Sequence, residues 1–144
     1  ALLSIGFFTG LSFVSETTTT NPDGIESHYN GNEHDEKATV MQFKKSKREI
    51  LTLVHNHTLS LSIIFFILAL ILSTTSINKR LKYFLMFEPF VSVLLTFGGI
   101  YLIWIGATWF KYIVMISGIM MTISFAISVI IIIFELLKSL KKSA

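Results

Sequence analysis

Three long apolar stretches constrain the fold of this chain more than any other feature. They cover residues about 58–76, 88–109 and 112–137 and carry very few charged side chains. About 20 apolar residues in a helix, at about 1.5 Å per residue, cross the ~30 Å hydrocarbon core of a bilayer. We therefore predict three transmembrane helices here. A composition of 52% hydrophobic and 15% charged residues agrees, because soluble domains are rarely so apolar.

A fourth apolar stretch opens the sequence. As a helix, residues 1–14 would be about 21 Å long, which is short of the hydrocarbon core. We expect a fourth span whose beginning is missing from this sequence. The alternative is the apolar region of a signal peptide, which has a similar length.

Between the first two apolar stretches the chain is polar, and residues 15–50 are predicted to form an extramembrane loop. The sequences NPDG and YNGN in this region favour turns. From about Val40 the pattern becomes helical and includes a basic cluster between Lys44 and Arg48.

The third span is expected to begin near Glu88, because Pro89 fits the first turn of a helix. Residues 81–87 would then lie in the membrane interface. The predicted fold is all-α: a single membrane domain, residues 1–144, built as a four-transmembrane-helix bundle with one polar extramembrane loop.

The distribution of basic residues predicts the orientation of this bundle. A four-span layout places six basic residues on one side, which the positive-inside rule assigns to the cytoplasm. The C-terminus would then be cytoplasmic and the loop 15–50 periplasmic. The cluster between Lys44 and Arg48 is a contrary signal, because it remains outside. The six residues are Lys79, Arg80, Lys82, Lys138, Lys141 and Lys142.

Small residues recur at spacings that let membrane helices approach closely. They are four positions apart in the first and fourth spans and seven apart in the second and third. We predict that these residues lie where helices pack: Gly6, Gly10, Ser62, Ala69, Ser92, Gly99, Gly106, Gly118, Thr122 and Ala126.

His55 and His57 in the sequence HNHT are the candidates for binding a metal or haem. On a regular helix, positions two apart point about 200° away from each other, so one ion would need irregular backbone to reach both. His28 and His34 of the loop could add ligands suited to zinc or copper. The alternative is structural, with His55 hydrogen-bonded at the rim of the bundle and the others hydrated.

Two carboxylates, Glu88 and Glu135, lie within or beside the apolar spans. An ionisable residue inside a membrane indicates a functional site. Both are predicted near the cytoplasmic border, however, with Glu88 capping the third helix and Glu135 paired with nearby lysines. The midplane would then hold only neutral polar groups, which disfavours a proton relay or an ion pump.

Catalytic motifs are not found in this sequence. It has no cysteine, no GxSxG, no HExxH and no phosphate-binding glycine loop. We therefore predict no catalytic residue and no cofactor, and we do not expect an enzyme.

Four segments carry a resemblance to a known group of proteins: GIESHYNGNE, HNHTLSLSIIFF, EPFVSVLLTFGGIYLIWIG and YIVMISGIMMT. They resemble small, uncharacterised four-helix inner-membrane proteins of bacteria. The resemblance implies a bacterial inner membrane and carries no activity with it.

These observations favour a non-catalytic accessory or structural subunit of a larger bacterial inner-membrane complex, such as a respiratory one. The expected partners are the lipid bilayer and other membrane-protein subunits, with no nucleic acid and no small-molecule substrate. The alternative is a membrane protein that binds metal or haem through His55 and His57.

Overall fold

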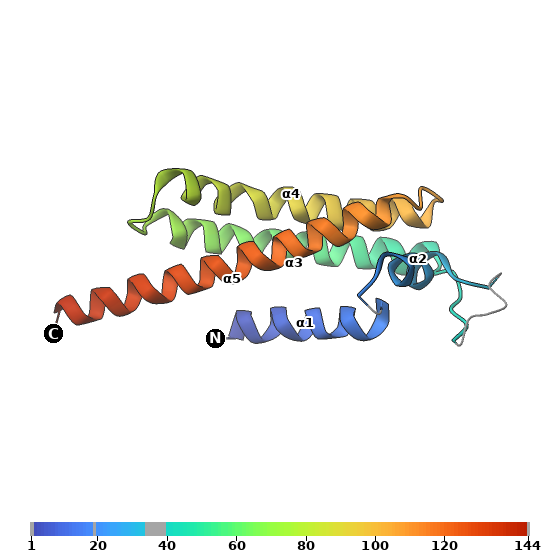
Figure 1. Cartoon of the computed structure of the whole chain (residues 1–144), viewed down its shortest axis with the longest axis horizontal. Helices are drawn as coiled ribbons and strands as arrows, with labels where there is room; N and C mark the ends of the chain where they lie inside the picture. The colour runs from blue at the N-terminus through green and yellow to red at the C-terminus, as the bar shows by residue number, and fades with distance from the viewer. Residues whose placement is uncertain (1, 19, 34–39, 144) are drawn as a thin grey trace.

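The computed structural model describes residues 2–18, 20–33 and 40–143, and these residues form five α-helices and no strand. Three long helices lie side by side, a fourth runs along the bundle, and a short one lies at the end where the first long helix begins (Figure 1). The helices are α1 (Leu2–Thr18), α2 (Pro22–Asn30), α3 (Lys47–Ser73), α4 (Lys79–Trp104) and α5 (Phe110–Ser143).

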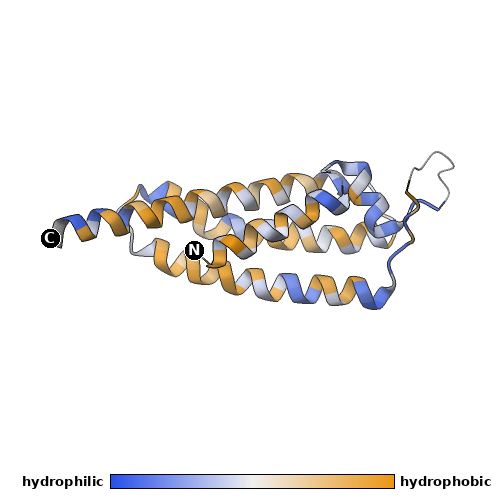
Figure 2. Ribbon diagram, turned by 90° about the horizontal axis from the view of Figure 1, so that it is seen from below, coloured by the Kyte–Doolittle hydropathy of each residue, from blue (hydrophilic) through white to orange (hydrophobic). Residues whose placement is uncertain are grey.

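By length and composition, α3, α4 and α5 are each able to cross a membrane. Their residues are hydrophobic along most of the length of each helix, whereas hydrophilic residues gather on α2 and near the helix ends (Figure 2). The predicted helical membrane protein is therefore confirmed, with three candidate spans among the described residues. The helix expected at residues 1–14 is present as α1, but its 17 residues extend only about 26 Å.

The start of α3 is determined by a capping box. The Glu49 backbone N–H donates to Ser46 Oγ at 3.3 Å, and the Ser46 N–H donates to Glu49 Oε2 at 2.8 Å. The helix therefore begins at Lys47, and its first turns precede the predicted apolar span at residues 58–76. Residues 40–46, where the pattern suggested a helix, are not helical.

The prediction that α4 starts near Glu88 is wrong. α4 begins at Lys79, where Asn78 Oδ1 accepts the Arg80 N–H at 2.9 Å, so Asn78 and not Glu88 caps this helix. Pro89 lies inside α4, as membrane helices allow when neighbouring groups satisfy the freed backbone. Glu88 is consequently an interior residue of α4 and not its cap.

The end of α4 is also earlier than predicted. Gly106 follows the helix with a φ of +110°, and its N–H donates to the Ile103 carbonyl at 2.9 Å. A glycine tolerates this left-handed conformation at a helix C-terminus. The expected helix-packing role of Gly106 is therefore wrong, because Gly106 terminates the helix.

The region predicted as a polar loop contains the whole of α2. Asn21 Oδ1 accepts the Gly24 N–H at 2.6 Å, and Pro22 occupies the first helical turn. The sequence NPDG thus starts a helix where a turn was expected. Ile25 and Tyr29, four positions apart, are buried by this arrangement.

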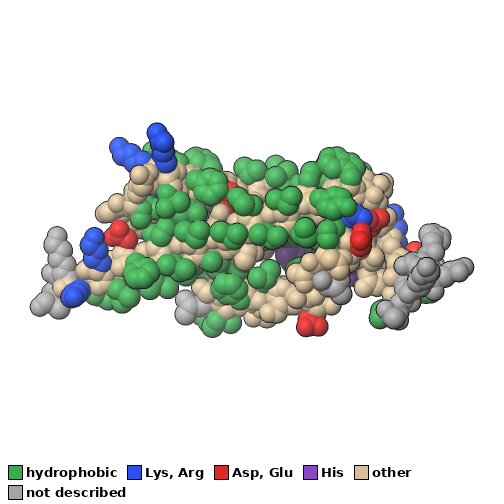
Figure 3. Space-filling model, viewed as in Figure 1, with side chains coloured by type: hydrophobic (Ala, Val, Ile, Leu, Met, Phe, Trp, Pro, Cys, Tyr) green, Lys and Arg blue, Asp and Glu red, His purple; other side chains and the backbone are tan. Residues whose placement is uncertain are grey.

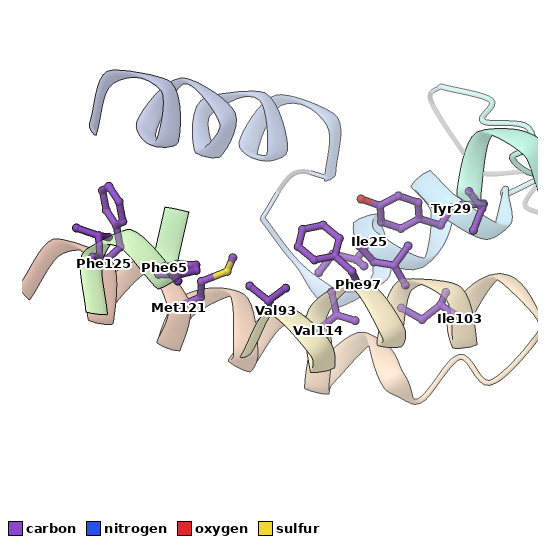
Figure 4. Packing of buried hydrophobic residues seen from close by; sticks show 12 residues of the cluster. Ile25, Tyr29, Phe65, Val93, Phe97, Ile103, Val114, Met121 and Phe125 are labelled. Carbon is purple, nitrogen blue, oxygen red and sulfur yellow. The ribbon is translucent and has the colours of Figure 1, made fainter. Parts of the chain in front are cut away.

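The core runs between the long helices and continues under α2 (Figure 4). Near one end, Phe65 of α3 and Phe125 of α5 meet edge to face, and Phe7 of α1 stacks on Phe125 with ring centroids 4.0 Å apart. At the other end, Ile103 is fully buried near Tyr29 and Ile25 of α2 (Figure 4). α2 therefore belongs to the same core as the membrane helices.

Candidate functional site

Glu88 lies well inside the apolar part of α4. It is about 9 Å along the helix axis from Lys82 and about 20 Å from Tyr101. Lysines and interfacial aromatic residues mark the two borders of a membrane helix, and Glu88 lies between these two, nearer to Lys82. A carboxyl group in the apolar part of a membrane helix indicates a functional site.

One oxygen of this carboxyl group has a partner and the other has none. Ser92, one turn further along α4, donates its hydroxyl proton to Glu88 Oε1. Glu88 Oε2 is buried and has no hydrogen-bond partner among the described residues. Leaving a buried polar atom without a partner is costly, so this oxygen is the strongest sign of a missing ligand.

Glu88 and Ser92 line a groove between α4 and α5 with a volume of about 280 Å³. Both walls follow one helix face, with residues at i, i+3, i+4 and i+7. The α3 helix does not contribute to either wall. The groove residues are Glu88, Val91, Ser92 and Leu95 of α4, with Ile113, Ile116, Ser117 and Met120 of α5.

A buried polar contact holds the two walls together. The hydroxyls of Thr96 and Ser117 hydrogen-bond to each other with an oxygen–oxygen distance of 2.7 Å, and both residues are buried. Next to this contact, a Cβ added to Gly99 would lie 2.6 Å from Val114 Cγ2. α4 and α5 are thus in close contact here, and the groove follows their line of contact.

A compact polar cap lies at the end of the bundle where α3 and α5 begin. We define this cap as residues 20–33 and 40–46 with the adjoining helix ends. The Lys111 amine of α5 contacts both Asp23 Oδ1 and Glu26 Oε2 of α2, each at 2.7 Å. Trp104 Nε1–H of α4 donates to the Lys45 carbonyl, also at 2.7 Å. These contacts attach α2 and the following segment to the membrane helices.

Asn32 holds the end of α2 against the segment 40–46 within the cap. Its side chain donates to the Val40 carbonyl at 3.0 Å and accepts the Gln42 N–H at 2.6 Å. The neighbouring Gly31 has a φ of +84°, and an added Cβ would lie 2.7 Å from the backbone nitrogen of Lys44. The sequence YNGN is therefore a structural requirement of the cap.

Two ring side chains in the cap have displaced pKa values. Burial raises the pKa of the Tyr29 phenol to about 12. Burial first, and the charge of Lys45 second, lower the pKa of His28 below its ordinary value. The docked cap thus favours neutral His28, whose ring packs edge to face on Tyr29.

The histidines proposed as ligands are not brought together. His57 stacks on Phe97 with centroids 5.2 Å apart, and its Nδ1 lies 3.0 Å from the Leu53 carbonyl. His55 is exposed. His34 lies outside the described residues. Among the residues that the structure does describe, no three His, Cys, Asp or Glu side chains form a metal-ligand cluster.

The predicted packing residues separate into two groups. Gly99 and Ser92 lie in the α4–α5 contact, and Ser62, Ala69, Thr122 and Ala126 are partly buried. By contrast, among the described atoms nothing lies within 4 Å of a Cβ added at Gly6, Gly10 or Gly118. These three glycines make no close helix contact within the described chain.

Glu135 takes part in a helix connection at the opposite end from the cap. Its Oε1 accepts the Ser76 N–H at 3.2 Å, in the turn between α3 and α4. In the same turn the Lys82 amine donates to the Ser73 carbonyl at 3.0 Å and to the Thr75 carbonyl. Both charged groups therefore stabilise the turn, and the amine of Lys82 is engaged there.

Sequence reasoning missed the groove because it misplaced the start of α4. Ser92 was identified as a small packing residue and Glu88 as a cap, so their pairing one turn apart was not recognised. The signal that could have found the site is Asn78, a good capping residue directly before the basic sequence 79–82.

The three long apolar helices define a helical membrane protein. A family model described as a transmembrane helical domain matches residues 19–143, and the chain belongs to this family, Aq_1264_TM. The matched range contains α2 to α5, so the cap and the three candidate spans are the shared domain. No curated protein and no solved structure matches the chain.

Proposed function

We propose that this protein is a non-catalytic subunit that binds laterally, within the membrane, to a larger membrane-protein complex. A bacterial inner-membrane complex, such as a respiratory one, fits the proposal best. The observation that carries it is the α4–α5 groove, which has a buried carboxyl oxygen without a partner at membrane depth. A monomer in lipid gives that oxygen no donor, whereas a second membrane protein does.

The apolar surface also suits a lateral subunit. Large apolar side chains are exposed along all three long helices, and Figure 3 shows them covering most of one face of the bundle. Lipid and a partner's membrane helices are both compatible with such a surface. The groove distinguishes the α4–α5 face as the one that a protein partner would cover.

We further propose that the C-terminus lies in the cytoplasm and the cap on the periplasmic side. The end opposite the cap carries exposed Lys79, Arg80, Lys138 and Lys141. At the cap, the Lys111 charge is matched by Asp23 and Glu26. The cap also carries exposed Lys44, Lys47 and Arg48. The proposal therefore rests on the basic residues beside the short α3–α4 turn and at the end of α5, which the positive-inside rule assigns to the cytoplasm. In this arrangement α1 would supply the fourth, shorter membrane helix.

Binding of metal or haem through His55 and His57 is the other proposal, and no contact in the described structure favours it. His57 is packed on Phe97. Among the described residues, no third His, Cys, Asp or Glu side chain joins His55 and His57 in a metal-ligand cluster. An absorbance spectrum and a metal analysis of the purified protein test it directly.

Affinity purification from native membranes in a mild detergent, followed by mass spectrometry, tests the favoured proposal. We expect one or more other membrane proteins in a fixed ratio to this chain, with any cofactor bound to them. A chain that purifies alone under conditions that preserve known complexes of the same membrane would contradict the proposal. A lone chain whose bound metal or haem is lost on His55→Ala would establish the alternative.

A further inference from the structure

We propose that the α4–α5 groove binds one transmembrane helix of the partner, and that this helix places a Lys or Arg side chain against Glu88. The inference rests on the proposed function and specifies its partner. It follows from the shape of the groove, the unsatisfied oxygen and the surface of the rest of the molecule.

The shape of the groove fits a helix. Its walls are two helix faces in contact, each with residues at i, i+3, i+4 and i+7. The Thr96–Ser117 contact offsets the two walls, so the groove residues extend about 18 Å along the bundle axis. Side chains of a third helix pack into such a seam in helical bundles. The exposed side chains along the seam, such as Val91 and Ile116, supply the apolar contact.

The chemistry of the groove calls for a cation. A carboxylate within the hydrocarbon region is stable when a basic group pairs with it. Ser92 satisfies only Oε1, and the nearest basic side chain on α4, Lys82, has its amine bound to the end of α3. The complementary charge must therefore come from outside the described chain.

A second copy of this chain does not offer that charge. The Thr96–Ser117 contact and the His57–Phe97 stacking fix the relative depths of the helices. At the depth of Glu88 the exposed side chains are all apolar. They include Ile63 and Phe66 of α3, Phe87 and Val91 of α4, and Ile123 and Ile127 of α5. A parallel copy would thus bring only another Glu88, so we assign the groove to a different protein.

Photo-crosslinking in native membranes tests the inference. A photoreactive residue replaces Val91 or Ile116 in the groove, and Ile63 on the outer face of α3 provides the control position. We expect Val91 and Ile116 to crosslink to one transmembrane helix that contains Lys or Arg, with a several-fold weaker product at Ile63.

Substitutions of Glu88 then test the charge pair. Glu88→Gln keeps the shape and the hydrogen-bonding capacity but removes the charge, and Glu88→Leu removes both. We expect each to lower the crosslink from Val91 by roughly 5- to 30-fold, the factor for one or two kcal/mol. Glu135→Gln, which removes the other carboxylate near the spans, should leave the crosslink unchanged. Replacing the partner's basic residue with Met in the Glu88→Leu background should restore it.

Several outcomes would overturn the inference. They are a crosslink to lipid only, a crosslink to a second copy of this chain, a partner helix without Lys or Arg, and a crosslink that Glu88→Gln does not weaken. Crosslinking of a partner from Ile63 but not from the groove would reject the groove and leave the proposed subunit role standing. No protein product from any position, together with a chain that purifies alone, would reject both.

Discussion

At the scale of single residues, Gly99 marks the closest approach of α4 and α5. A Cβ at this position would meet Val114 Cγ2 at 2.6 Å, and Val114 is a buried, β-branched side chain with little freedom to move. Gly98, the next residue along the same helix, has nothing within 4 Å of its Cβ position among the described atoms. The two neighbouring glycines therefore differ in their packing.

We expect Gly99→Ala to separate the two helices and to lower the free energy of unfolding by about 1–3 kcal/mol. Gly98→Ala, with no clash, should instead raise it by about 0.5–1 kcal/mol, because Ala favours a helix more than Gly does. Unfolding in mixed micelles with increasing SDS, followed by circular dichroism, measures both. Equal effects of the two substitutions would show that α4 and α5 do not meet at Gly99.

His28 predicts a pH dependence of the cap. Its pKa is lowered in the folded protein by burial and by Lys45, so the unfolded chain binds more protons than the folded one. Stability must therefore rise with pH. It is fully present above the ordinary value of 6.5 and declines as the pH falls below 6.5 towards the lowered pKa.

Trp104 fluorescence in a Trp109→Phe background measures this dependence, because the Trp104 indole is bonded to the cap. We expect the denaturant concentration at the unfolding midpoint to decrease when the pH is lowered from 7 to 5.5. The His28→Gln variant should show a smaller decrease. An identical pH response in the two proteins would contradict neutral His28 in the docked cap.

The spacing of small residues in the sequence predicted part of this helix packing. The seven-residue spacing singled out Ser92, which lines the α4–α5 groove, and Gly99, which lies against Val114 of α5. The same spacing included Gly106, which lies beyond the end of α4. A glycine in a periodic pattern is consistent with close packing and with helix termination, and only the backbone around it distinguishes the two.

At the scale of elements, α2 shows how a polar segment becomes part of a membrane fold. Its inner face buries Ile25 and Tyr29, and its outer face contacts Lys111 through Glu26 and Asp23. The Asp23 side chain is 88% exposed and that of Glu26 is 29% exposed. Because water screens exposed pairs, the Glu26 contact should dominate.

We expect Glu26→Gln to weaken the docking of α2 by about 0.5–1 kcal/mol, and Asp23→Asn to weaken it by at most about 0.3 kcal/mol. Hydrogen exchange of the α2 amides, compared between the two variants and the parent protein, measures the difference. A larger effect of Asp23→Asn would mean that Lys111 is held mainly by the exposed carboxylate.

The boundaries of α4 explain why the site itself was not predicted. Asn78 and Glu88-Pro89 are both reasonable helix starts in the sequence. Which of the two starts the helix depends on the contacts of Lys82 and Glu135 with the α3–α4 turn. These are tertiary contacts, which the local sequence does not reveal. Hydropathy thus predicted that the three long helices exist, whereas the bounds of α4 and the place of Glu88 within it required the position of that turn.

At the scale of the whole molecule, the two ends of the bundle differ in charge. The end at which α5 finishes carries exposed Lys79, Arg80, Lys138 and Lys141, and Figure 3 shows basic side chains there. The cap end combines basic residues, among them exposed Lys44, Lys47 and Arg48, with the acidic residues Asp23, Glu26 and Glu49. The proposed orientation rests on the excess of basic over acidic residues at the end where α5 finishes.

Single-cysteine labelling tests the orientation cleanly, because the chain has no native cysteine. Met41→Cys in the cap should react with a membrane-impermeant maleimide in spheroplasts, which are cells with the outer membrane opened and the inner membrane intact. Lys141→Cys should react only after the membrane is permeabilised. The reverse pattern would show that the C-terminus is outside.

The most direct measurement of the proposed role is native mass spectrometry of the particle released from its own membrane. A lateral subunit predicts a species whose mass is that of this protein plus a different polypeptide in fixed ratio, with the free protein released by Glu88→Leu. A spectrum that contains only this protein or whole multiples of its mass would contradict the proposed role.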